Sequence, residues 1–217
     1  MNINFIKGKS FLAIFLAAAL MFAVLNVWMT FLPLAQSEGE GGTVDITATV
    51  APSVTCDTDV TATGFGPLST GSVTTATPNA STTLSCNTGL GCTLSVSDVG
   101  DGATNPGLAT TTPAYLIPSP NAAYDPTAVL AINTEGYGIT ATTTTGGSGG
   151  SLTIYSRYDH DSGGTTVGGL KRSGFGVASS SGAISNRQLT IKHKAAISGA
   201  TQAGKYEDTL TYSCTGN

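Results

Sequence analysis

Four cysteines are the residues of this chain best suited to covalent chemistry, as disulfides or as metal ligands. The five-residue gap between Cys86 and Cys92 is a poor spacing for zinc ligands, so we favour disulfides. Sequence alone allows three pairings. Cys86 and Cys92 bracket a short connection between two expected antiparallel strands, and Cys56 and Cys214 meet at one pole if the first and last strands run side by side. We prefer these two pairs, with Cys56–Cys86 and Cys92–Cys214 as the alternative.

Catalytic chemistry is weakly indicated. Residues 146–150 read GGSGG and match the G-x-S-x-G string of a nucleophile elbow, but that device needs a preceding strand, a following helix and a positioned histidine. A low-complexity loop explains the match. The two histidines, His160 and His193, have charged or polar neighbours, so we expect both on the solvated surface. We expect no catalytic residue; a secreted hydrolase that uses Ser148 or His193 is the remote alternative.

Metal and cofactor sites are also not indicated. Residues 159–164 read DHDSGG and begin like a calcium loop, yet Gly163 replaces one ligand and Leu170 stands where a bidentate acid belongs. Asp98 and Asp101 fit a turn around Gly100 better than a calcium site. We therefore expect neither a metal nor a cofactor.

The N-terminus predicts export. Lys7 and Lys9 precede an almost unbroken apolar stretch at 11–35, and the small residues of Ala35-Gln36-Ser37 fit a cleavage site after Ser37. The stretch also has the roughly 20 residues that cross a bilayer, so a retained hydrophobic helix is the alternative. We expect residues 1–37 to be a signal peptide or membrane anchor, 38–42 a tether and 43–217 one domain. An exported domain at the cell surface or in the medium would lie in an oxidising compartment.

The charge balance limits the partners. The chain carries 9 basic and 13 acidic residues, and setting aside Lys7 and Lys9 leaves 7 against 13, a net charge of −6. Such a surface disfavours nucleic acid and anionic lipid. We therefore expect no nucleic acid partner.

Short alternating runs between Gly, Pro and Asn turns predict an all-β fold, a sandwich of short strands. The alternation of Val44 to Val50 predicts the first strand of this domain, with donation of that strand to a neighbouring molecule as the alternative. Five prolines in 100–127 predict a long ordered loop or an edge segment. Further strands are expected at 81–85, 93–97, 136–143, 152–155, 189–197 and 206–214.

The last segment, residues 203–212, reads AGKYEDTLTY and resembles the AGxYxDTxTY ending of bacterial exported β-sandwich surface proteins of the spore coat protein U and pilin-like type. Gly64-Phe65-Gly66, some twenty residues before Cys86, is similar to the FG turn of that family. The run 135–139 around Tyr137 resembles an element of uncharacterised exported proteins with the same ending. The resemblance implies an immunoglobulin-like sandwich in coats, pili or surface layers, often assembled with a periplasmic chaperone. The four cysteines and the Pro-rich loop depart from its simplest pattern.

The same ending has a direct physical interpretation. Gly204 permits a turn between the last two strands, which we expect to form a hairpin. Tyr206 packs its ring at the strand start while its hydroxyl bonds loop backbone, and Tyr212 falls at an inward position. With Phe65 and Tyr137, these are the residues to which we assign a structural role.

We expect a non-enzymatic, structural or adhesive module of the cell envelope. Its partners would be other envelope proteins or further copies of itself, and the membrane if the N-terminal helix is retained. The alternative is a module that binds glycans or peptides through loop aromatics, namely Tyr115, Tyr124, Tyr155 and Tyr158.

Overall fold

The computed structural model describes residues 42–217 except 113 and 145. The expected signal or anchor at 1–37, its cleavage site after Ser37 and most of the tether lie outside the described residues. The chain divides into a unit that ends at Thr49 and a compact unit from Val50 to Asn217. Among the residues described, no helix is long and apolar enough to cross a bilayer.

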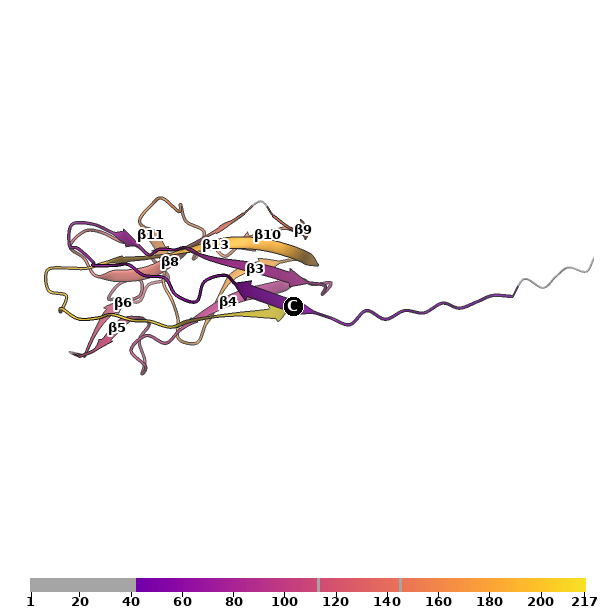
Figure 1. Cartoon of the computed structure of the whole chain (residues 1–217), viewed down its shortest axis with the longest axis horizontal. Coiled ribbons are helices and arrows are strands. Elements are labelled where there is room, and N and C mark those ends of the chain that lie inside the picture. The colour runs from indigo at the N-terminus through magenta and orange to yellow at the C-terminus, as the bar shows by residue number, and fades with distance from the viewer. Residues whose placement is uncertain (1–41, 113, 145) are drawn as a thin grey trace, which may run out of the picture. The chain divides into compact units, whose positions relative to one another are not determined.

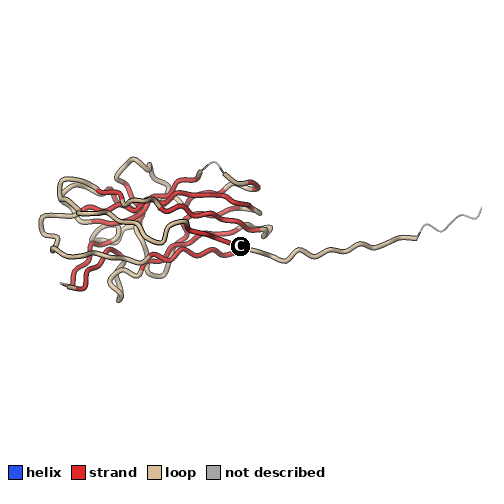
Figure 2. The backbone as a smooth tube through the Cα atoms, in the orientation of Figure 1, coloured by secondary structure: helices blue, strands red, loops and turns tan. Residues whose placement is uncertain are grey.

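The described part of the chain is all-β, without a helix (Figure 2). Its fourteen strands pair antiparallel throughout. They are β1 (Val54–Thr58), β2 (Thr74–Thr75), β3 (Ala80–Cys86), β4 (Cys92–Asp98), β5 (Gly107–Thr111), β6 (Ala114–Pro118), β7 (Thr127–Val129), β8 (Gly136–Thr143), β9 (Ser148–Gly149), β10 (Leu152–Ile154), β11 (Thr166–Gly168), β12 (Phe175–Ser180), β13 (Ile184–Ala196) and β14 (Leu210–Gly216).

Two sheets enclose the core (Figure 1). The larger sheet has the order β1-β3-β13-β8-β11-β7, with β2 and β9 also paired to β13, and the smaller has the order β10-β12-β4-β14. Period-two alternation buries every second residue of β3 and β4, among them Leu84 on the first sheet and Leu94 and Val96 on the second. Most core side chains are aliphatic or small, as expected from a domain with few aromatic residues.

Both disulfides join one sheet to the other. Cys56 on β1 is bonded to Cys214 on β14, with Cα atoms 6.0 Å apart, and Cys86 on β3 is bonded to Cys92 on β4, with Cα atoms 6.3 Å apart. These are the preferred pairs. The first holds together the two edge strands at one end of the molecule, where Figure 1 shows the C-terminus beside β1.

Strands occur at or around 81–85, 93–97, 136–143, 152–155 and 189–197, as predicted. Two predictions are wrong and a third is incomplete. Residues 43–50 form no strand and are exposed, so the first strand of the domain is β1. The interval 100–127 is not merely a loop, because β5 and β6 pair within it as a separate two-stranded sheet. The last two strands form no hairpin: β13 and β14 belong to different sheets, and 197–209 connect them.

Candidate binding groove

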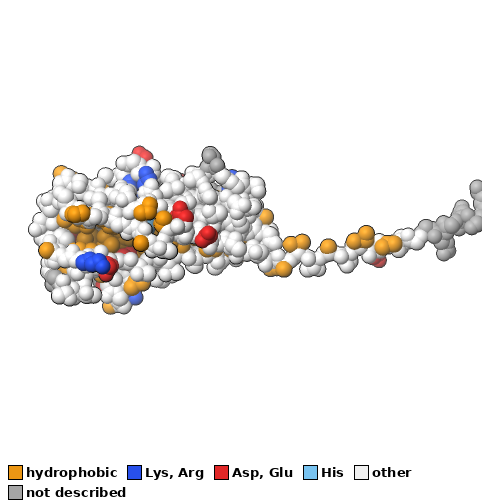
Figure 3. Space-filling model, viewed as in Figure 1, with side chains coloured by type: hydrophobic (Ala, Val, Ile, Leu, Met, Phe, Trp, Pro, Cys, Tyr) orange, Lys and Arg blue, Asp and Glu red, His pale blue; other side chains and the backbone are white. Residues whose placement is uncertain are grey.

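Two strand edges without a partner flank a groove. Among the described residues, β1 pairs only with β3, and β14 pairs only with β4. The disulfide between Cys56 and Cys214 holds these edges together at one end. Beyond it, the segments 58–68 and 201–212 line opposite parts of a groove of about 1430 Å³. Figure 3 shows hydrophobic side chains gathered in the hollow of this face.

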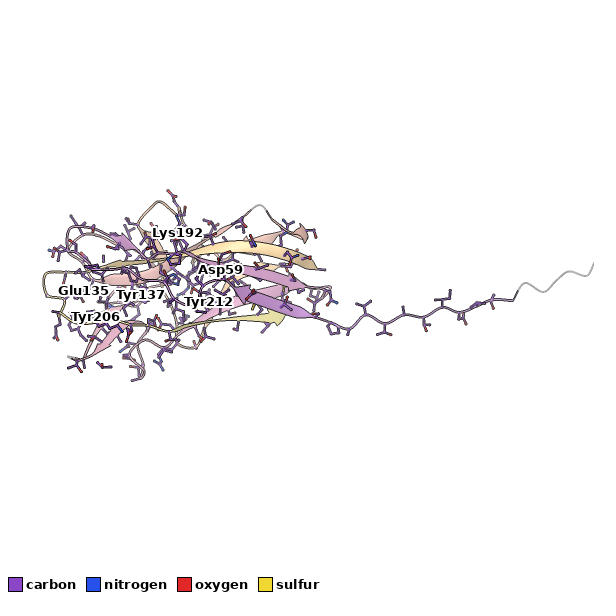
Figure 4. The ribbon with its side chains drawn as sticks, viewed as in Figure 1. Asp59, Glu135, Tyr137, Lys192, Tyr206 and Tyr212 are labelled. Atoms are coloured by element: carbon purple, nitrogen blue, oxygen red, sulfur yellow. A yellow bond between two sulfur atoms is a disulfide. The ribbon has the colours of Figure 1, made fainter. Side chains whose placement is uncertain are left out.

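The groove is lined by the residues to which the sequence assigned a structural role: Phe65, Tyr137, Gly204, Tyr206 and Tyr212. Three of them are labelled in Figure 4. Tyr137, on β8, is 3% exposed and meets Phe65 edge to face, with ring centroids 6.1 Å apart. Gly204 lies in a bend and its φ is not positive, but the bend does not join two strands of one sheet as expected. Ala80, Leu108 and Ile197 add aliphatic surface to the lining.

His193 also lines the groove, and the prediction that it lies on the solvated surface is wrong. It is 4% exposed, and its Nε2 lies 3.1 Å from the hydroxyl of Tyr212. Its Nδ1 is buried without a hydrogen-bond partner among the described residues. Burial lowers the pKa of His193 to about 4, so the imidazole is neutral at neutral pH.

Two carboxyl groups, one buried and one half-buried, meet at this groove. Asp98, the last residue of β4, is 4% exposed, and Asp208 precedes β14 by two residues. Burial, the negative charge of Asp208 and the hydrogen bond between the two side chains raise the pKa of Asp98 to about 8. Burial also raises the pKa of Asp208. The pairing of Asp98 with Asp208 was not predicted from the sequence, which placed Asp98 in a turn with Asp101.

One wall of the groove is braced by polar contacts. Glu135 Oε1 accepts hydrogen bonds from Tyr115 at 2.8 Å, Ser198 at 3.3 Å and Thr201 at 2.5 Å. The hydroxyl of Tyr206 donates to the carbonyl of Gln202 at 2.7 Å, which confirms the predicted bond to loop backbone. The wall at 198–207 is therefore held by side chains as well as by the bridge between Glu207 and Ala109.

The candidate nucleophile and base are not brought together. Ser148 is exposed and pairs with Ser185 on β13, whereas His193 lies eight residues further along that strand, roughly 26 Å away. Arg187 donates to the carbonyls of Gly146, Gly149 and Gly150 and so fixes the glycine-rich loop.

The calcium-like loop is a turn closed by lysine. Asp161 accepts the amide of Gly163 at 2.9 Å, and the ammonium of Lys194 binds the carbonyls of Ser162 and Gly164. A side-chain cation thus takes carbonyls that a metal would need. No cluster of potential metal ligands occurs among the described residues.

The loop aromatics do not form one surface. Tyr158 is fully buried, so its prediction as a surface residue is wrong. Tyr124 and Tyr155 are 41% and 39% exposed. Tyr115 is half-buried and packs edge to face against Tyr206, with ring centroids 6.3 Å apart.

Comparisons of the chain with family models, with curated proteins and with solved structures found no match.

The alternation of buried and exposed positions along the strands could have indicated that His193 and Asp98 are buried. On β13, His193 continues the inward series of Leu189 and Ile191, and on β4 Asp98 continues that of Leu94 and Val96. A polar residue in register with core positions indicates a buried polar site.

Proposed function

We propose that this protein is a non-enzymatic, exported structural subunit of the cell envelope, whose groove binds residues 43–50 of a second copy as an additional β-strand. The domain would then be an immunoglobulin-like sandwich without its last strand, and copies would assemble head to tail. The observation that carries the proposal is the groove between the unpaired edges of β1 and β14.

The groove suits a strand better than a small molecule. Its volume of about 1430 Å³ exceeds the roughly 300–1,000 Å³ of typical small-molecule pockets. The free edge of β14 offers backbone groups for pairing, and the aromatic and aliphatic lining offers contacts to alternate side chains. Binding by strand addition draws on both features.

Residues 43–50 have the composition of such a strand. Val44, Ile46, Ala48 and Val50 alternate with polar residues, and in the structure this segment is exposed and unpaired. An alternating strand with an unburied apolar face gains free energy by placing that face against a hydrophobic surface.

The position at which the chain enters β1 favours binding of residues 43–50 by the groove of a second copy over binding by the groove of the same molecule. The side chain of Asn87 accepts a hydrogen bond from the amide of Ser53 at 2.6 Å and donates to the carbonyl of Ala51 at 2.9 Å. This fixes the chain where β1 begins, opposite the end of β3, whereas the groove is lined from Thr58 onward. Residues 43–50 would have to reverse direction to reach their own groove.

The segment before β14 supports the immunoglobulin-like assignment. Tyr206 precedes the last strand, and its hydroxyl returns to a carbonyl four residues upstream. Immunoglobulin-like domains place a tyrosine with such a bond near the start of their penultimate strand. By this comparison β14 is the penultimate strand, and the strand that would follow it is the one supplied by another copy.

Light scattering coupled to size-exclusion chromatography tests the proposal on the exported, oxidised protein. We expect oligomers that grow with protein concentration, and their loss in Ile46→Asp, which places a charge in the apolar face. Thr47→Asp is the matched control, since it changes the opposite face and should preserve assembly. A fully stable monomer at every concentration would contradict the proposal, and a monomer destabilised by Ile46→Asp would indicate self-insertion.

A further inference from the structure

The carboxyl groups of Asp98 and Asp208 meet at the groove, with Asp98 buried and Asp208 half-buried. Asp98 Oδ2 accepts the amide of Gly107 at 3.1 Å, and Asp208 Oδ1 accepts the amide of Gly100 at 3.3 Å. The remaining oxygens, Oδ1 of Asp98 and Oδ2 of Asp208, are buried without any other donor among the described residues. Since carboxylates only accept hydrogen bonds, the bond between these two side chains requires a proton.

Among the described residues, no salt bridge reaches the pair. The ion pairs of the described chain join Arg172 to Asp101 and Lys205 to Glu207, and the ammonium of Lys171 lies over the ring of Phe175. The titratable groups close to the pair are three phenols, Tyr137 from β8, Tyr158 after β10 and Tyr212 from β14. Tyr137 also forms a side-chain hydrogen bond to Asp208. The same burial raises the pKa of each phenol, so none of them supplies charge.

Asp98 and Asp208 connect three parts of the groove wall, which are the end of β4, the loop before β5 and the segment that leads into β14. Asp98 ends β4, and Asp208 leads into β14, the strand whose free edge borders the groove. Their bonds to Gly100 and Gly107 hold both ends of the loop that enters β5. In β5, Leu108 lines the groove, and Ala109 exchanges two backbone bonds of 2.8 and 3.0 Å with Glu207.

We propose that the proton shared by Asp98 and Asp208 is a latch on the groove wall. With the proton in place, the loop 100–107 and the start of β14 stay closed on β4. When the proton is lost, two neighbouring like charges, one of them buried, repel each other, and the segments of the wall move apart and admit water. This inference rests on the proposed function. It predicts that the groove binds the donated strand more tightly in mild acid and more weakly in mild alkali.

Amide hydrogen exchange of the exported, oxidised protein tests the latch without any ligand. After correction for the intrinsic exchange rate, we expect opening of segments 98–109 and 207–212 to rise at least tenfold from pH 6 to pH 9. Asp98→Asn should abolish this dependence, because an amide cannot ionise and can donate to Asp208. Asp57→Asn, a change of an exposed carboxyl on β1, should leave it intact. Equal opening at both pH values in the wild type would overturn the proposal.

A second measurement protects the test against a variant that does not fold. The carboxyl carbon signals of Asp98 and Asp208 in the wild-type protein should titrate in the same pH range in which the wall opens. Titration of both groups below pH 5 would overturn the latch.

Binding of a synthetic peptide of residues 42–51 then tests whether opening of the wall changes the affinity of the groove for the donated strand. Using Ile46→Asp protein, whose own segment cannot compete, we expect the dissociation constant to rise at least tenfold from pH 6 to pH 9. Absence of binding at every pH would contradict the proposed function, while the exchange result alone would still decide the latch. Binding of equal strength at both pH values would overturn the regulation of the groove.

Discussion

The hydroxyl of Tyr212 lies 3.1 Å from Nε2 of His193, and this hydrogen bond joins the two sheets inside the groove. His193 belongs to β13 of the larger sheet, and Tyr212 belongs to β14 of the smaller one. A neutral imidazole thus forms part of the contact between the sheets where the groove separates them.

This contact predicts a loss of stability in acid. The folded protein keeps His193 neutral down to about pH 4, whereas the unfolded chain binds a proton below about pH 6.5. The unfolded state binds more protons in this range, so the free energy of unfolding falls as the pH falls from 6.5 to 4, by at most about 3 kcal/mol. Because the carboxyl of Asp98 contributes the opposite slope in this range, the expected result is a difference between two proteins. In urea unfolding, the unfolding free energy of wild type relative to that of His193→Gln should fall by up to about 3 kcal/mol from pH 6.5 to pH 4. His160→Gln is the control, because it leaves the contact between His193 and Tyr212 in place.

Asp98 predicts the opposite trend. In the folded protein its carboxyl keeps a proton up to about pH 8, while in the unfolded chain it ionises above about pH 3.8. Stability from this group is fully present below pH 3.8 and is lost as the pH rises to 8. From pH 6.5 to 8 the unfolded histidine loses its remaining proton and its opposing slope fades, so the unfolding free energy should fall, by at most about 1.4 kcal/mol per pH unit. In urea titrations at pH 6.5 to 8, a flat profile for wild type, or the same slope in Asp98→Asn, would exclude this interpretation.

The two disulfides should differ in what they contribute to stability. Cys56 and Cys214 are separated by 158 positions in the sequence, and Cys86 and Cys92 by 6. Chain entropy then predicts a loss of about 5 kcal/mol for the double alanine variant of the first pair and about 2 kcal/mol for that of the second. Urea unfolding of both variants measures the difference. A larger loss for the short-range pair would show that chain entropy does not govern these bonds.

Glu135 should stabilise the groove wall. Its Oε1 accepts three hydroxyl donors, so Glu135→Gln, which removes the charge, should lower the free energy of unfolding by about 1–3 kcal/mol. Glu207→Gln is the matched control. Its side chain is 70% exposed and pairs only with Lys205, so the change should cost less than about 0.5 kcal/mol. Similar losses in the two variants would mean that Glu135 does not brace the wall.

The strands were largely predictable, because their alternation is local. Residues 136–143 form β8 with the predicted bounds, since apolar and β-branched residues fill a strand buried in the sheet. The partner of each strand was less predictable. The segments 189–197 and 206–214 were predicted as two strands around Gly204. Alternation does not say in which sheet a strand lies, and β13 and β14 lie in different sheets.

The candidate site was predictable in part. Tyr137, Tyr206 and Tyr212 were singled out, and all of them line the groove. The buried polar residues were missed because neighbours in sequence were weighed more heavily than register. His193 stands between two lysines, yet Lys194 is itself buried by its bonds to the loop at 162–164. Asp208 finds its partner 110 positions earlier in the chain, beyond the reach of any local pattern.

Photo-crosslinking between copies tests the central claim, that the groove binds residues 43–50 of another molecule. The exported protein would carry benzoylphenylalanine in place of Ile46 and be mixed with isotopically heavy protein without the label. We predict crosslinked peptides that join a light residue 46 to heavy segments 58–68 or 201–212. Crosslinks found only within light molecules, or only outside the groove, would contradict the account.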